Sequence, residues 1–238
     1  MRFSLRTYSV FAALCLCTAA AAQVGQHRSD FSIGATVGWD MNRKNFVPTI
    51  KQTYLQSPLI GFAARYICEK YFTCIAGVQA EVNYNNLGWK EVIEDGSDNT
   101  YSRHLHYIEV PLMMQMGWGR EVRGLKFVFM AGPQFGFLIG DKANPGGTWD
   151  TSRRPRGVTY QYDHNPDNWF DYGIAAGLGV ELSTAIGHFI LEGRYYYGLG
   201  DTYDNSKKGY FSRSANQTIQ AKLTYLIDII RTKNCIRK

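Results

Sequence analysis

The chain lacks the features that define several large protein classes. Beyond its N-terminus, no stretch approaches the roughly 18 consecutive apolar residues that a membrane-spanning helix needs, which excludes a polytopic helical membrane protein. Aromatic residues are too abundant for a disordered chain, with 16 Tyr, 13 Phe and 5 Trp among 238 residues. Charged residues make up 19% of the chain, and the net charge of +6 is too small to indicate a nucleic acid partner. What remains is a chain rich in glycine and aromatic residues whose mean hydropathy is polar.

Residues 1–22 have the features of a secretory signal peptide. Arg2 and Arg6 form a short positive region, residues 10–17 are apolar, and a run of small residues ends at Ala22. This order predicts export and cleavage after Ala22. Cleavage leaves 24 basic residues against 20 acidic ones, a mature net charge of +4.

Three of the five cysteines remain after cleavage, in a compartment where disulfides persist. Cys68 and Cys74 flank a short connector and face each other if the hairpin centres on Tyr71. The sequence leaves open a disulfide between them or two free thiols. Cys235 has no partner in either interpretation.

Apolar residues alternate with small or polar residues through most of the mature chain, which is typical of β-strands. Most of these segments approach the roughly 9 to 11 residues of a tilted membrane strand. The eight apolar faces span residues 31–39, 60–66, 72–84, 108–118, 125–131, 170–182, 189–199 and 219–227.

Long and short connectors alternate strictly between these strands. Four long polar connectors lie near residues 40–57, 85–105, 141–168 and 200–215, and three short ones near residues 68–71, 119–124 and 183–187. Outer-membrane barrels have long external loops and short periplasmic turns. We therefore predict an all-β fold, an eight-stranded antiparallel transmembrane β-barrel over residues 23–227, followed by a tail at 228–238. A soluble lipocalin-like barrel is the alternative, and it would place the apolar face inside.

The second face of the strands carries charges of both signs. Eight strands leave an interior just wide enough for side chains, so these charges are expected to neutralise one another inside the barrel. The predicted lumenal ion-pair network comprises Arg65, Glu81, Glu109, Lys126, Asp171, Glu181, Glu192, Arg194 and Lys222. Symmetric hairpins would repeatedly place a long side chain opposite a glycine: Arg65 opposite Gly77, Glu81 opposite Gly61, Lys126 opposite Gly117, Glu192 opposite Gly179 and Arg194 opposite Gly177. Pro111 and Pro133 lie at comparable heights on neighbouring strands, which predicts a shared bulge.

Three other chemistries are alternatives to this network. Glu81 and Glu109 could share one mouth of the lumen and act as an acid and a base. His104 and His106 could form a metal or catalytic cluster with Glu109, but no fourth ligand has suggestive spacing. Ser97 and Ser102 lie near His104, as in a lipid-modifying enzyme, without any nucleophile signature. The expectation is therefore no catalytic residue, no metal and no cofactor.

Two long connectors carry clusters of basic residues. Their charge predicts contacts between these connectors and lipopolysaccharide phosphates, and ordinary solvated loops are the alternative. They are Arg153, Arg154, Arg156, Lys207, Lys208 and Arg213.

The segment 107–112, Tyr-Ile-Glu-Val-Pro-Leu, resembles the fourth strand of the PorT-like outer-membrane barrels that are abundant in Bacteroidetes. Supporting segments lie at residues 81–90, 132–134, 170–181 and 192–195, so the resemblance covers nearly the whole mature chain. It implies an outer-membrane location and says little about activity. One relative is linked to protein secretion, a role that the resemblance does not imply for this chain.

Together these features predict an outer-membrane barrel with a filled polar lumen and a structural or binding role through its external loops. Its partners would be outer-membrane lipid, lipopolysaccharide and an envelope protein. A small-solute channel and a lipid-modifying enzyme are the alternatives. A general diffusion pore is disfavoured because eight strands leave no wide channel.

Overall fold

The computed structural model describes residues 26–71, 73–94, 96–120, 123–149, 159–205 and 209–231, so the expected signal peptide lies outside the described residues. One short helix, α2 (Tyr160–Asp163), lies between β6 and β7. The strands are β1 (Gln26–Val47), β2 (Gln52–Thr53), β3 (Leu55–Tyr71), β4 (Cys74–Glu91), β5 (Thr100–Gly119), β6 (Gly124–Gly146), β7 (Phe170–Ser183), β8 (His188–Gly198) and β9 (Arg213–Ile230).

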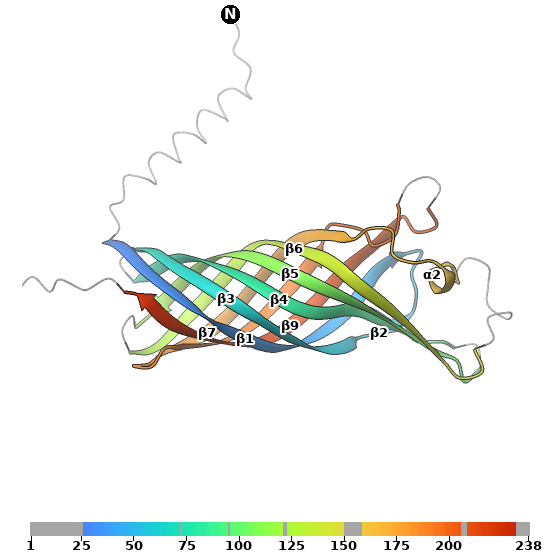
Figure 1. Cartoon of the computed structure of the whole chain (residues 1–238), viewed down its shortest axis with the longest axis horizontal. Coiled ribbons are helices and arrows are strands. Elements are labelled where there is room, and N and C mark those ends of the chain that lie inside the picture. Colours follow the sequence, from blue (N-terminus) through green and yellow to red (C-terminus); the bar gives the residue numbers. More distant parts are fainter. Residues whose placement is uncertain are drawn as a thin grey trace, which may run out of the picture.

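Eight of these strands form a closed ring, which confirms the predicted barrel. Antiparallel pairs run in the order β4-β3-β1-β9-β8-β7-β6-β5, and the pairing of β4 with β5 closes the ring. The two-residue strand β2 pairs with the last two residues of β4. Figure 1 shows the ring from the side, with its strands tilted across a long barrel.

The two ends of the barrel differ. The three short connections, the start of β1 and the end of β9 lie together at the left of Figure 1, and we call this the turn end. The opposite end carries β2 and α2, and we call it the loop end. This arrangement follows from the alternating short and long connectors. The last strand runs to Ile230, three residues beyond the predicted end at Ile227, so the tail begins later than expected.

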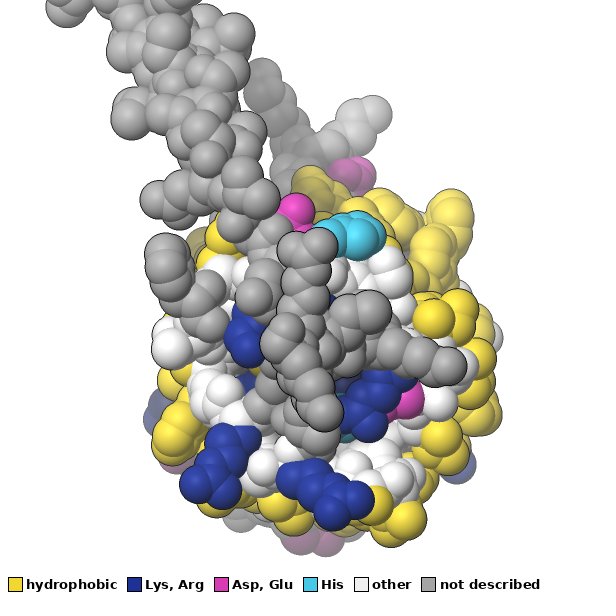
Figure 2. All heavy atoms as spheres, turned by 90° about the vertical axis from the view of Figure 1, so that its left-hand side faces the viewer, with side chains coloured by type: hydrophobic (Ala, Val, Ile, Leu, Met, Phe, Trp, Pro, Cys, Tyr) yellow, Lys and Arg dark blue, Asp and Glu magenta, His cyan; other side chains and the backbone are white. Residues whose placement is uncertain are grey.

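The outer wall of the barrel is apolar and the inner face is polar. Phe62 is 74% exposed and Leu178 is 70% exposed, whereas the charged residues on the alternate positions are almost fully buried. Figure 2, which views the turn end, shows hydrophobic side chains around the outside of the ring. A soluble barrel would have the opposite polarity, so the lipocalin-like alternative is wrong. Among the described residues, no helix is long and apolar enough to cross a membrane.

The strands extend much further at the loop end than predicted. Alternation continues through β4 as far as Glu91 and starts in β5 at Thr100, inside the connector expected at 85–105. In this extension the polarity reverses: Leu87 and Trp89 point inward and are buried, while Lys90 points outward. A wall that stands in water above the membrane needs an apolar interior, as any soluble barrel does. The barrel is therefore membrane-type in its lower part and soluble-type at its loop end.

Two of the three expected hairpin registers are wrong by two residues. Arg65 pairs with Gln79 rather than Gly77, and Lys126 pairs with Gly119 rather than Gly117. The direction of each side chain survives because a two-residue shift keeps the same face. In the third hairpin Gly177 pairs with Arg194 and Gly179 with Glu192, as predicted.

The bulge expected at the two prolines is absent from that position. Pro111 pairs with Gln134, and the same register continues to Met114 and Ala131. The shift between β5 and β6 lies nearer the loop end, between His106 and Tyr107. It brings Lys142 opposite His104, with both side chains on the outer wall.

Gly179 provides a test of the packing on the inner face. A Cβ atom added there would lie 2.6 Å from the backbone oxygen of Leu191, on the neighbouring strand, which cannot move without disturbing the ladder. We expect Gly179→Ala to lower the free energy of unfolding by about 1 to 3 kcal/mol. Gly193→Ala is the matched control on β8, because a Cβ there meets nothing within 4 Å. Urea unfolding of the barrel in lipid vesicles would compare the two, and equal stability of both variants would contradict the packing.

Candidate functional site

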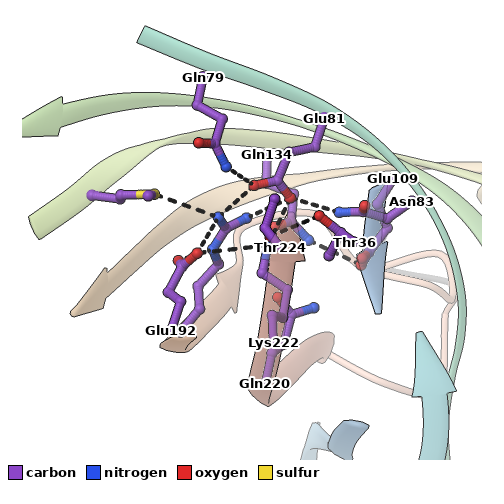
Figure 3. Close-up of polar contacts among 12 residues, drawn as sticks. Thr36, Gln79, Glu81, Asn83, Glu109, Gln134, Glu192, Gln220, Lys222 and Thr224 are labelled. Carbon is purple, nitrogen blue, oxygen red and sulfur yellow. Dashed lines mark hydrogen bonds and ion pairs between the residues drawn. The ribbon is translucent and has the colours of Figure 1, made fainter. Parts of the chain in front are cut away.

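The middle of the lumen contains a cluster of four charged side chains. Glu81 on β4 accepts hydrogen bonds from both terminal nitrogens of Arg194 on β8, at 2.8 and 3.2 Å. Lys222 Nζ on β9 lies 2.6 Å from Glu81 Oε2. Arg194 also binds Glu192, with 2.7 Å between Nε and Oε1. Two carboxylates and two cations thus meet in one place, and Figure 3 shows Glu81, Glu192 and Lys222 converging from different strands.

Neutral side chains complete the coordination of Glu81. Gln79 and Asn83, two residues away on the same strand, each donate an amide N–H to a Glu81 oxygen at 2.8 Å. All four charged side chains of the cluster are at most 1% exposed. Buried charges of this kind are stable only when they are paired and their remaining hydrogen-bonding atoms are satisfied. We call Glu81, Glu192, Arg194 and Lys222 the central cluster.

A second cluster lies nearer the turn end and has Glu181 at its centre. Its carboxylate lies 2.9 Å from Arg65 Nη1 and 2.9 Å from Lys126 Nζ. His188 lies between Glu181 and Asp228, with its two ring nitrogens 2.8 and 3.1 Å from their oxygens. These contacts join strands β3, β6, β7, β8 and β9 across the lumen.

The second cluster also contains a serine. Ser183 Oγ lies 3.0 Å from His188 Nδ1, and Asp228 lies on the other ring nitrogen. This order resembles a hydrolytic triad. However, Glu181 Oε1 also lies within hydrogen-bond distance of Nδ1, and Ser183 is only 2% exposed. A nucleophile must reach its substrate, so the arrangement fits a structural network better than catalysis.

The structure separates two of the predicted network residues from these clusters. Glu109 accepts hydrogen bonds from Gln134 at 2.9 Å and Asn85 at 3.3 Å. Asp171 accepts from the hydroxyl of Tyr196 at 3.0 Å and from Asn216 at 2.8 Å. Among the described residues, neither carboxylate has a cation within 4.0 Å. The upper lumen is therefore held by amide and hydroxyl donors.

The loop end is closed by an aromatic core that sequence reasoning missed. Trp89, Tyr101 and Leu105 are at most 1% exposed and pack with residues from β1 and the β8–β9 connection. The buried members of this core are Phe46, Ile50, Leu87, Trp89, Tyr101, Leu105, Tyr107, Tyr203 and Phe211. Burial raises the pKa of the Tyr203 phenol, which keeps this hydroxyl neutral. The alternation of apolar residues within 87–105 was the available signal, hidden because it occurs in a polar connector.

Helix α2 is anchored over this core by two charged side chains. Arg103 donates to the backbone oxygens of Gln161 and His164, at 2.9 and 2.7 Å. Glu91 accepts from the Gln161 amide at 3.0 Å and from the Tyr162 hydroxyl at 2.5 Å. We call α2 with Arg103 and Glu91 the mouth plug. It covers the loop end of the lumen with protein.

The predicted lipopolysaccharide contacts fall mostly outside the described residues. This applies to Arg153, Arg154, Arg156, Lys207 and Lys208. Arg213 is described, and its Nη2 atom donates to the backbone oxygen of Gly198 at 3.1 Å. Its guanidinium also lies over the Tyr197 ring, 5.8 Å from the centroid.

The described residues bear on two alternatives that the sequence leaves open. Cys68 and Cys74 are free thiols. They do not face each other as a hairpin centred on Tyr71 would require, because Tyr71 pairs with Cys74 and a register shift falls between Ile67 and Glu69. His104 and His106 lie on the outer wall, on the opposite face from Glu109, so these three residues form no cluster. No group of three potential metal ligands occurs in the described part of the chain.

A closed barrel with an apolar wall and a salt-bridged lumen defines the chain as an outer-membrane β-barrel protein. Residues 21–204 match the family described as outer membrane protein beta-barrel domain, and the chain belongs to that family.

The chain is also similar, at low sequence identity, to several solved structures. Ail, the attachment invasion locus protein of Yersinia pestis, is 12% identical, with a TM-score of 0.38 and coverage of 85% of this chain and 99% of Ail. Neisserial surface protein A is 11% identical, with a TM-score of 0.41 and coverage of 83% and 96%. OprG from Pseudomonas aeruginosa is 11% identical, with a TM-score of 0.45 and coverage of 86% and 95%. Among curated proteins, none matches the sequence.

Proposed function

We propose that this outer-membrane barrel is a non-conducting scaffold that presents a binding surface at its loop end. The observation that carries the proposal is the filled interior. From the turn end, the second cluster around Glu181, the central cluster, the aromatic core and the mouth plug follow one another along the lumen. An ion crossing the barrel would have to displace buried salt bridges and then a packed apolar layer, both of which are costly.

Conductance in a planar lipid bilayer tests this proposal against the small-solute channel. We expect the purified barrel to give no stable conductance steps, because side chains fill the lumen. A large porin inserted by the same procedure serves as the positive control for the bilayer. Reproducible single-channel openings of the wild-type barrel would contradict the proposal and favour the channel.

The binding surface is proposed to act on envelope components rather than to carry out catalysis. The basic residues Arg153, Arg154 and Arg156 in the β6–β7 connection and Lys207 and Lys208 in the β8–β9 connection have the charge needed to meet lipopolysaccharide phosphates. An envelope protein is a second proposed partner. Photo-crosslinking from a residue beside α2 in intact cells, followed by identification of the crosslinked molecule, would name the partner.

Within the family, we propose that the chain is one of the PorT-like barrels of Bacteroidetes, exported through a signal peptide that is cleaved after Ala22. The support is the strand at 107–112 with its accompanying segments, and the order of positive, apolar and small residues in 1–22. Mass spectrometry of the outer-membrane form would test the cleavage, with Gln23 expected as its first residue.

A further inference from the structure

The wall of the barrel is split at the loop end, between β1 and β2. Strand β1 pairs with β3 up to Asn42, which lies opposite Leu55. Beyond that point β1 keeps β9 as its partner as far as Val47, while β2 pairs with β4. In the described ladder, the edge of β1 that faces β2 therefore has no strand partner over residues 43–47.

A glutamine side chain takes the place of the missing strand at one point. The Gln52 oxygen accepts the backbone N–H of Lys44 at 2.9 Å, and the Gln52 amide donates back to the Lys44 carbonyl. The rest of the split forms a cavity of about 420 Å³, within the range of small-molecule sites. Arg43, Lys51 and Tyr54 line it and are exposed, so a ligand can reach it from outside the barrel.

Among the described residues, the side chains that line this cavity include three basic ones and no acidic one. Arg43, Lys44 and Lys51 line it together with the aromatic ring of Tyr54 and the carboxamides of neighbouring residues. Lys44 points into the lumen, where its ammonium donates to the Thr202 hydroxyl. Lys51 pairs with Glu94, and both side chains are mostly exposed.

Arg43 is the cation that remains available to a ligand. Its Nε atom donates to Gln217 Oε1 at 2.9 Å, which fixes the guanidinium over the Tyr54 ring, 5.5 Å from the centroid. Among the described residues, no carboxylate forms an ion pair with Arg43. Its two terminal nitrogens can therefore bind an anion in the bidentate geometry that guanidinium groups favour.

The position of the cavity along the barrel axis indicates which layer of the membrane it faces. Met41, the outward residue before Arg43 on β1, still belongs to the apolar wall and is 37% exposed. Arg43 is the next outward position, so the cavity opens just above the apolar band, at the level of lipid headgroups. An exposed aromatic ring, amide groups and a fixed cation together suit a sugar ring that carries an anionic substituent.

We propose that the split between β1 and β2 is a binding site for a sugar ring bearing phosphate or sulfate. The site deepens the proposed binding role of the loop end. Two sources supply this chemistry: phosphorylated sugars of outer-leaflet lipopolysaccharide and free sulfated saccharides. Binding at the site and conductance through the lumen are measured separately, so a conducting barrel that still binds the anionic probes would refute the scaffold and leave this inference standing.

Titration of the purified barrel in detergent tests the site with three probes: phosphorylated lipopolysaccharide, the same material after dephosphorylation, and sucrose octasulfate. We expect Arg43→Gln to weaken binding about tenfold, because a charged hydrogen bond is lost. Tyr54→Ala should weaken it by a similar factor. Lys142→Gln removes one outward charge from β6, away from the split, and should leave the affinity within about twofold of wild type.

The probes also separate the two sources. Binding of phosphorylated lipopolysaccharide alone would assign the site to the outer leaflet, and binding of sucrose octasulfate alone would assign it to a free saccharide. Three results would overturn the proposal: no binding of either anionic probe, equal binding of the dephosphorylated probe, or equal losses in Lys142→Gln and Arg43→Gln. The shift in gel mobility between boiled and unboiled samples verifies that each variant is folded.

Discussion

Glu81→Gln is expected to lower the free energy of unfolding by about 3 to 5 kcal/mol, the usual cost of leaving buried charges without their partner. The substitution keeps the shape of the side chain but removes the charge that Arg194 and Lys222 share. Glu192 would remain as the second carboxylate of the central cluster, with its Oε2 atom 3.9 Å from Lys222 Nζ. Urea unfolding of the barrel in lipid vesicles gives the measurement.

Two further variants show whether this loss comes from the buried cluster. Glu94→Gln breaks the exposed pair with Lys51 and should cost less than about 1 kcal/mol. Combining Glu81→Gln with Lys222→Gln should cost less than the sum of the two single changes, because the same pair is broken in both. Additive losses, or equal effects of the Glu81 and Glu94 changes, would show that the central cluster does not hold the strands together.

Arg103→Ala is expected to release the mouth plug while the barrel stays folded. The side chain is anchored to the backbone oxygen of Gln161 in α2, to that of His164 just after α2, and to Asp141 on β6. Each hydrogen bond to a charged group contributes about 1.5 to 3 kcal/mol. Losing about 3 kcal/mol makes the population of molecules with an open mouth plug roughly a hundredfold larger. Amide hydrogen exchange in residues 160–164 should rise accordingly.

Lys90→Ala is the matched control for this change. Lys90 lies opposite Ser102 on the neighbouring strand, next to Arg103 in height, but it points outward. We expect its removal to leave exchange in α2 unchanged. Equal exchange in Arg103→Ala and wild type would mean that the aromatic core alone keeps the loop end closed, and the role assigned to Arg103 would be wrong.

The ring of eight strands was predictable from the sequence because the period-two pattern and the connector lengths are local signals. The reversal of polarity at the loop end was not predicted, although Leu87, Trp89 and Lys90 alternate as regularly as any membrane strand. The apolar residues there face inward because water, rather than lipid, surrounds the outer wall. The same alternation can therefore place its apolar residues on the outer wall, in lipid, or in the interior, where water surrounds the wall. The sequence does not indicate the height at which the barrel passes from lipid into water.

The charged lining was also predictable, but the partners within it were not. Strand tilt and stagger set which strands face each other across a lumen, and a hairpin gives the register of adjacent strands alone. Glu81 meets Arg194 across 113 positions of sequence, a contact that no local rule supplies. Glu109 points into the lumen as Glu81 does, but it lies nearer the loop end. Its neighbours there are Gln134 and Asn85 instead of a cation.

Access of water-soluble reagents to the lumen tests the filled barrel most directly. Thr36 and Thr224 face each other inside the ring, 2.8 Å apart at their hydroxyls, and each is 1% exposed. In a chain with Cys68, Cys74 and Cys235 replaced by Ser, a cationic thiol reagent should leave Thr36→Cys unmodified while it labels Lys142→Cys readily. Labelling of Thr36→Cys at a comparable rate would show a hydrated lumen and contradict the account.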